Sequence, residues 1–420
     1  MKKRFHKLDL DLYEETLNNG LSVYIVPMKN VNNIYATFTT KYGGVDTTFQ
    51  SNGKVIKTPA GVAHFLEHKM FENKDGIDTF TIFDQNGASS NAATSNYKTT
   101  YLFSGPTKFK ENITTLLNFV QEPYFTDENV EKEKGIIIEE IQMCDDNPGR
   151  VGYNKTLENA FCKHPIRVPV IGSKESVTSI TKEDLYICYQ AFYHPKNMFL
   201  VITGNVDPKE TIKIIKENQK NKHFSESYEK EVIMPKEPDK VYKKKTVQTM
   251  NVTIPKVYFS YKINIENSNL SNRYMMKYLS IYLDSLYGSV SDFSEEIEKE
   301  KISNDGVDFF LSKTDTHILI TFVAETKKAN AFIKMVEKYM GLKISIDDFH
   351  RKKKIMLSSN IYMSENIYKM NNYVTANILD YDEVITDVYE ENENLSYNEL
   401  TNFVKNIDFT NKTTVIIKQK

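Results

Sequence analysis

Cysteine is rare in this sequence, and net charge is almost absent. Three cysteines, Cys144, Cys162 and Cys188, occur among 420 residues, and none has the CxxC spacing of a thiolate metal site. Their odd number and their spacing argue against a disulfide framework and against zinc bound by cysteine. The formal charge of -2 gives no electrostatic reason to expect a nucleic acid or an anionic membrane as a partner.

Long apolar runs are also missing. No stretch approaches the roughly 20 residues that a membrane-spanning helix needs, so no membrane partner is expected. The chain begins with basic residues, as a signal peptide does, but charged residues return at Asp9 and Asp11 and no apolar segment follows. We therefore expect a cytoplasmic protein.

Histidine is scarce as well, which makes the placement of two of the 8 histidines informative. His64 and His68 lie four positions apart in the sequence GVAHFLEH at residues 61–68, and on a helix such residues are neighbours on one face. Two imidazoles held in this way are the usual beginning of a zinc site. A catalytic zinc keeps three protein ligands and an open position, so one ligand is still missing from the motif.

Glu67 precedes His68 on the same broad face and completes the order H-x-x-E-H, the inverse of the common H-E-x-x-H zinc motif. A carboxylate that lies near the metal without binding it can take a proton from water acidified by zinc. We therefore predict that His64 and His68 are zinc ligands and that Glu67 is the general base. The competing interpretation is a pair of polar histidines on the surface of an amphipathic helix.

Acidic residues farther along the chain are candidates for the missing ligand. Residues 127–143 are predicted to form one long helix, on which Glu133 and Glu140 lie two turns apart and share a face. Either could equally be a solvated surface charge. Their distance in sequence from the histidines does not decide the question.

A stretch of small side chains, GASSNAAT at residues 87–94, separates these two helices and leads into a predicted strand at residues 99–103. Small side chains allow another backbone to approach closely. The stretch could therefore be an open strand edge that receives an extended peptide through main-chain hydrogen bonds. A plain loop followed by a strand explains these residues equally well.

Length and an internal similarity predict two domains. A chain of 420 residues exceeds what one hydrophobic core usually supports. A helix that opens at Thr181 and a following strand recur as a helix that opens at Ser396 and its following strand. At one constant offset, the apolar residues Leu185, Leu200 and Ile202 correspond to Leu400, Val415 and Ile417.

These correspondences favour two tandem copies of one domain, although the window is short enough for a chance similarity. We expect an N-terminal metal-binding domain at residues 1–217, a linker at 218–245 and a C-terminal homologous domain without the metal motif at 246–420. The linker prediction rests on a polar, charge-rich composition with two prolines.

With these elements placed, the chain resembles the inverzincin metallopeptidases, the family of pitrilysin, insulin-degrading enzyme and the mitochondrial processing peptidase. Within it, the chain is similar to the bacterial single-unit, processing-peptidase-like subgroup. The resemblance is carried by HFLEH at residues 64–68, GASSNA at 87–92, EKEKGIIIEEI at 131–141 and YHPKNM at 193–198. It implies an α+β fold of two tandem homologous domains, each a β-sheet covered by helices.

The resemblance also implies roles for individual residues. Family members take the third zinc ligand from the glutamate of a V-I-I-x-E pattern, which falls on Glu140, with a supporting glutamate at Glu133. Glu133 would hold a ligand histidine, or the metal site as a whole, by hydrogen bonding. Asn91 and Ala92 would align the substrate strand. One zinc ion per chain and a peptide substrate follow from the same resemblance.

The expected function is that of a zinc-dependent endopeptidase that cleaves peptides or small unfolded proteins. The alternative is a non-catalytic scaffold or binding subunit, because the family contains subunits that keep the fold and lose the chemistry. Such subunits normally lose the motif, whereas the residues of this motif are intact here.

The second half of the chain lacks an arginine–tyrosine pair that active family members use, and we therefore expect a partner subunit. Active family members use an arginine followed seven residues later by a tyrosine, supplied from the second half of the enclosed particle. The second half of this chain contains two arginines, Arg273 and Arg351, and Ser280 and Ser358 stand seven residues after them. In the family, two such two-domain units enclose a chamber. We therefore expect a heterodimer with a related chain that supplies the pair. A homodimer is also possible, because two identical units could close the chamber, but it would not supply the pair.

Overall fold

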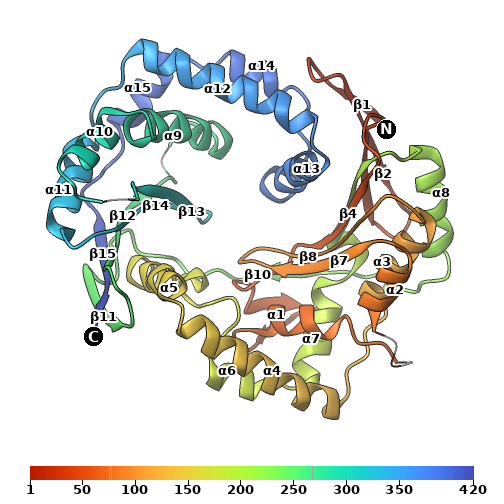
Figure 1. The fold of residues 1–420 in the computed structure, drawn as a ribbon. Coiled ribbons are helices and arrows are strands. Elements are labelled where there is room, and N and C mark those ends of the chain that lie inside the picture. Colours follow the sequence, from red (N-terminus) through yellow and green to blue (C-terminus); the bar gives the residue numbers. More distant parts are fainter. Residues whose placement is uncertain (75, 77, 267, 304) are drawn as a thin grey trace. The chain divides into compact units, whose positions relative to one another are not determined.

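The structure is a computed structural model that describes residues 1–420 except residues 75, 77, 267 and 304. The chain forms two compact units. Unit 1 comprises Met1–Ile141, Pro169–Met234 and Ser358–Glu391, and unit 2 comprises Gln142–Val168, Pro235–Leu357 and Asn392–Lys420. Figure 1 shows the order of the elements along the chain.

Unit 1 is built on a seven-stranded sheet in the order β1-β2-β3-β9-β4-β8-β7. Its strands are β1 (Lys2–Phe5), β2 (Leu10–Thr16), β3 (Ser22–Pro27), β4 (Ile34–Thr40), β7 (Ser89–Thr94), β8 (Thr99–Gly105) and β9 (Met198–Gly204). Strand β9 is apolar from Met198 to Ile202 and is buried along its whole length, as expected for a central strand covered on both faces. Strand β7 is the terminal strand at one edge.

Helices cover both faces of this sheet. They are α1 (Val62–Lys69), α2 (Thr79–Gln85), α3 (Phe109–Gln121), α4 (Asp127–Asp145), α6 (Lys174–Ser179), α7 (Lys182–Phe192), α8 (Pro208–Gln219) and α13 (Ile367–Tyr381). On one face, Leu200 and Ile202 belong to the same core as Phe65 of α1. On the other face, Val201 packs in a second core with Met370 and Val374 of α13. A small sheet in the order β10 (Lys230–Val232), β5 (Thr48–Ser51) and β6 (Lys54–Lys57) completes the unit.

Unit 2 contains a five-stranded sheet in the order β11-β15-β12-β14-β13. Its strands are β11 (Lys245–Met250), β12 (Lys256–Asn264), β13 (Asp308–Lys313), β14 (His317–Glu325) and β15 (Lys412–Gln419).

The remaining elements of the chain, from both units, are α5 (Pro148–Ala160), α9 (Asn272–Tyr287), α10 (Asp292–Lys299), α11 (Ala329–Tyr339), α12 (Ile346–Ser364), α14 (Val388–Glu393), α15 (Tyr397–Lys405) and the 3-10 turns η1 (Pro165–Arg167) and η2 (Pro195–Asn197).

The two large sheets repeat one topology. Strands β11, β15, β12, β14 and β13 follow the order and directions of β3, β9, β4, β8 and β7, including the parallel first pair. Leu200 pairs with Val23 and Phe38, and Val415 occupies the same place between Thr246 and Tyr258. The predicted fold class, two tandem homologous α+β domains, is confirmed.

The compact units nevertheless exchange helices, which the sequence did not predict. Helix α5 belongs to unit 2 and α13 belongs to unit 1. Polar contacts explain the placement of α13, because Asn371 Nδ2 donates to Val201 O at 2.9 Å and Thr37 Oγ1 donates to Asn371 Oδ1 at 2.9 Å. The predicted linker, residues 218–245, also contains β10, which pairs with β5. The limits 1–217 and 246–420 stay a prediction of where the homologous copies divide.

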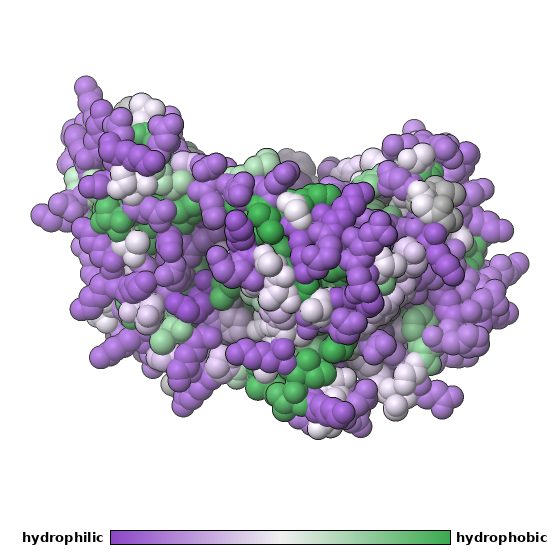
Figure 2. All heavy atoms as spheres, turned by 90° about the horizontal axis from the view of Figure 1, so that it is seen from below, coloured by the Kyte–Doolittle hydropathy of each residue, from purple (hydrophilic) through white to green (hydrophobic). Residues whose placement is uncertain are grey.

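Hydrophilic side chains predominate on the molecular face shown in Figure 2, with smaller hydrophobic areas between them. Within the described part of the chain, none of the helices has the length and apolar character required to cross a membrane.

Gly61, the residue before α1, gives a testable prediction about how this helix is seated. Its φ of +100° is left-handed, and an added Cβ would lie 2.8 Å from Ile171 O. Gly53 is also left-handed, at φ +73°, but has open space around it. Both alanine substitutions strain the backbone, because both positions have a left-handed φ, and only Gly61→Ala also introduces a steric clash. We expect Gly61→Ala to lower the free energy of unfolding by about 1 to 3 kcal/mol more than Gly53→Ala.

Urea unfolding of the two variants measures this difference. Equal losses of stability in Gly61→Ala and Gly53→Ala would show that the approach of Ile171 does not fix the start of α1.

Candidate metal centre

Helix α1 divides its residues between a buried face and a polar face. Val62, Phe65 and Leu66 are buried in the core of unit 1. His64 and His68 therefore project together from the opposite side, with ring centroids 4.6 Å apart. The i,i+4 spacing thus places both imidazoles on one face, as the sequence predicted.

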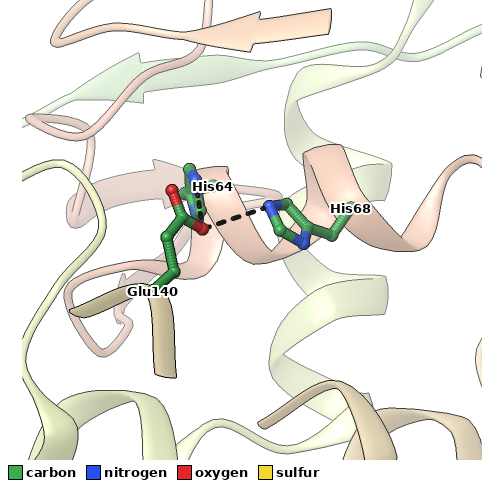
Figure 3. Close-up of side chains that lie close together, drawn as sticks. All are labelled: His64, His68 and Glu140. Atoms are coloured by element: carbon green, nitrogen blue, oxygen red, sulfur yellow. Dashed lines mark ion pairs between the residues drawn. The ribbon is translucent and has the colours of Figure 1, made fainter. Parts of the chain in front are cut away.

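Helix α4 brings Glu140 to these rings. Val130, Ile137 and Ile141 form its buried side, which leaves Glu140 partly exposed beside α1. Glu140 Oε2 lies 3.7 Å from His64 Nε2 and 3.6 Å from His68 Nε2, and Figure 3 shows its carboxylate facing both rings. One ligand atom from each residue lies within 4.8 Å of the other two.

This donor set fits zinc. Zinc binds histidine nitrogen and carboxylate oxygen at roughly 2.0–2.2 Å, and in a tetrahedral site such ligand atoms lie about 3.3 Å apart. The separations of 3.6 and 3.7 Å between Glu140 and the histidines are close to that value. Two imidazoles and one carboxylate leave a fourth position open, which is the arrangement of a catalytic zinc site.

Glu133 lies behind His68. Its Oε1 accepts a hydrogen bond from His68 Nδ1 at 2.9 Å, which leaves Nε2 with the lone pair that a metal needs. Burial opposes protonation of His68, but the hydrogen bond to Glu133 and the charges of Glu67 and Glu140 outweigh burial and raise its pKa. Without a metal, the carboxylates around His68 therefore favour its protonated form.

Lys69 extends this contact into the protein interior. Its side chain is completely buried, with Nζ 2.6 Å from Glu72 Oε1 and 3.6 Å from Glu133 Oε2. A buried charge is costly unless it is paired, so the fold must keep these carboxylates in place. The lysine occupies the same buried stripe of α1 as Val62 and Leu66, and this helical periodicity could have identified it from the sequence.

Glu67 points toward the edge strand. Its Oε2 lies 2.5 Å from Thr94 Oγ1, which donates to the carboxylate. Burial raises the pKa of Glu67, and the hydrogen bond from Thr94 and the nearby His68 partly oppose this shift. Glu67 is not among the three residues whose ligand atoms converge. This placement is the one expected of a base beside a metal, and sequence reasoning had not identified Thr94.

Most of the stretch of small residues at 87–94 forms β7, the last strand of the sheet. Its position at the edge agrees with the interpretation of this stretch as an open strand edge. Ser95 N donates to Lys98 O, which makes this a hydrogen-bonded pair of the hairpin. Hydrogen-bonded and non-hydrogen-bonded pairs alternate, so the main-chain groups of Ala92 and Thr94 point away from β8 to the open edge. Ala92 N donates to Asn91 Oδ1 at 2.8 Å, and the side chain of Asn91 is exposed.

Two family sequence models match the chain. The model "Insulinase (Peptidase family M16)" matches residues 56–174, which include the candidate metal centre, and the model "Peptidase M16 inactive domain" matches residues 179–356. The second name agrees with the absence of an H-x-x-E-H motif from that part of the sequence.

Individual proteins agree with these matches. The "Uncharacterized zinc protease YmfH" of Bacillus subtilis (strain 168) is 44% identical over 292 residues, covering 68% of each chain. The crystal structure of an M16-like peptidase from Alicyclobacillus acidocaldarius has a TM-score of 0.94 at 30% identity and covers 99% of this chain and 100% of that chain. A protease from Helicobacter pylori shares the fold, with a TM-score of 0.82 at 20% identity over 97% of this chain and 99% of that chain.

The contact between Glu133 and His68 predicts a change in metal retention. Glu133→Gln keeps the shape of the side chain but removes the charge that faces His68 and Lys69, so we expect zinc affinity to fall about 10- to 100-fold with folding preserved. Glu131→Gln is the matched control, because Glu131 is exposed on the same helix and pairs with Lys134. Zinc titration against a competing chelator measures both variants. Unchanged affinity in Glu133→Gln would contradict the assigned role.

Proposed function

The chain belongs to peptidase family M16, and from this membership we propose that it is a zinc-dependent endopeptidase that cleaves peptides or small unfolded proteins. The observation that carries the proposal is the convergence of His64, His68 and Glu140, with Glu67 beside them. A non-catalytic scaffold subunit is the alternative. A scaffold role does not require a half-buried carboxylate beside three residues whose possible metal-ligand atoms converge.

Each residue of the centre has a distinct part in the proposed mechanism. His64 and His68 would bind one zinc ion through Nε2, and Glu140 through its carboxylate. Zinc, when bound, supplies a Lewis acid for the scissile carbonyl and for water. Glu67 would accept the proton of the attacking water at Oε1, because Oε2 is engaged by Thr94. The same carboxyl group could then deliver that proton to the leaving amine.

The open edge of β7 suggests how a peptide would be presented. An extended substrate could add to this edge as a further strand, through main-chain hydrogen bonds that do not depend on its sequence. Ala92 would contribute its outward-facing N–H, and Asn91 would have to release that N–H first. This manner of binding favours peptides and unfolded segments, because a folded substrate has few unpaired strands to offer.

We further propose that this chain works with a related partner subunit. The segment between α9 and β13, where the arginine and tyrosine would be expected, contains neither an arginine nor the pair, and its helix α10 is acidic. Arg351 lies on α12, where its Nη2 is 2.5 Å from Asp348 Oδ1. A partner that carries the pair would supply the missing donor to the substrate carbonyl.

Replacing Glu67 separates metal binding from catalysis. Glu67→Gln retains the three ligands but loses the base, so the variant should bind zinc normally and cleave peptides about 100- to 10,000-fold more slowly. Zinc content and hydrolysis of an unfolded peptide are measured on the same preparation, with His68→Ala as the control that should lose zinc. Normal cleavage by Glu67→Gln, or loss of its zinc, would rule out the assignment.

The partner proposal predicts complementation. The purified chain alone should cleave unfolded peptides slowly, and a related chain that lacks H-x-x-E-H and carries the arginine–tyrosine pair should raise the rate on the order of 100-fold. A partner with its arginine replaced by alanine serves as the control. Full activity of this chain alone, whether as a monomer or as a homodimer, would refute the proposal.

A further inference from the structure

Strand β7 contacts the proposed base, Glu67, through the hydroxyl group of Thr94, and Glu67 is the best-placed acceptor for the proton of that hydroxyl. Thr94 Oγ1 lies 2.5 Å from Glu67 Oε2 and 3.3 Å from Thr99 Oγ1. Thr99 Oγ1 donates its own proton to Tyr42 O at 3.0 Å. An ionised carboxylate can only accept, so the proton of Thr94 is directed to Glu67.

Thr94 is also fixed by the strand that carries it. Its pairing with Thr99 closes the β7–β8 ladder next to the turn, where Ser95 N is bonded to Lys98 O. A β-branched side chain in a strand has few accessible χ1 rotamers, so the hydroxyl has little freedom to move. The main-chain groups of the same residue face the open edge of the sheet. One residue thus contacts the base with its side chain and the substrate edge with its backbone.

We propose that Thr94 is a positioning residue that sets Glu67 relative to a peptide added at the edge of β7; this rests on the proposed peptidase function. The hydroxyl holds Oε2 of Glu67 and leaves Oε1 to face the attacking water. Without this hydrogen bond the glutamate side chain can adopt other rotamers, in which its free oxygen no longer lies near the scissile bond. Metal binding should not depend on Thr94, because the partners of its hydroxyl among the described residues are Glu67 and Thr99, and neither belongs to the converging set of His64, His68 and Glu140.

Two substitutions at Thr94 distinguish positioning from packing. Thr94→Val has nearly the same shape and keeps the β-branched backbone preference but lacks the hydroxyl, whereas Thr94→Ser keeps the hydroxyl and loses a methyl group. Thr100→Val is the matched control, because Thr100 is a buried threonine of the neighbouring strand β8 whose hydroxyl is bonded to Thr39. All three are assayed as the zinc-loaded enzyme, alone and together with the related chain proposed to carry the arginine–tyrosine pair.

We expect Thr94→Val to lower kcat about 10- to 100-fold with KM changed less than about threefold and zinc content unchanged. Thr94→Ser should recover most of kcat, and Thr100→Val should match the wild type. Equal kcat in Thr94→Val and wild type would overturn the proposal. Equal losses in Thr94→Val and Thr94→Ser would also overturn it, because they would show that the methyl group and not the hydroxyl is needed.

A second measurement does not depend on activity. Crystal structures of the metal-free wild type and Thr94→Val should show Glu67 bonded to Thr94 in the former and displaced or in several rotamers in the latter. An unmoved Glu67 in Thr94→Val would refute the positioning role. If zinc-loaded wild type with its partner cleaves no peptide, the proposed function fails, and the crystal structures still decide whether Thr94 positions Glu67.

Discussion

The metal centre depends on one buried polar contact, in which Glu133 lies between His68 Nδ1 and Lys69 Nζ. Helix α1 has only 8 residues, which is too short to be stable without tertiary packing. The buried apolar side of α1 holds this helix against the core of unit 1, and the contact with Glu133 holds α4 against α1. Because Glu140 follows Glu133 by two helical turns, the same contact places Glu140 opposite the two Nε2 atoms. A displacement of either helix by one residue would separate the ligands.

The sheet adds the second constraint. Strand β7 lies at the edge and touches α1 through Thr94, so the proposed base and the proposed peptide-binding edge belong to one connected structure. Gly61 contributes to the same rigidity, because it allows the segment at Ile171 to approach the start of α1. The proposed metal ligands, the proposed base and the strand edge are therefore held by the same part of unit 1.

The sequence predicted those parts of the centre that are encoded locally. His64, Glu67 and His68 follow from helical spacing within five residues, and Leu200 and Val415 revealed the repeated domain. Helical spacing made Glu133 and Glu140 candidates, but the choice of Glu140 as the third ligand came from a family resemblance, because no local rule links residues so far apart in the chain. The contacts of Lys69 and Thr94, and the exchange of α5 and α13 between the units, depend on tertiary packing that periodicity does not encode.

The second half of the chain repeats part of this arrangement without the residues of the candidate metal centre. Helices α4 and α12 both have 19 residues, and Lys352 stands at the seventh position of α12 as Glu133 does in α4. Lys352 is buried and pairs with Asp284 of α9 at 2.7 Å, so an ion pair again joins the long helix to the helix packed beside it, with the charges exchanged. Ser359 takes the position of Glu140, and α9 offers no histidine. An ion pair at this position thus occurs in both halves of the chain, and among the described residues only the pair in the first half lies beside a cluster that could hold a metal.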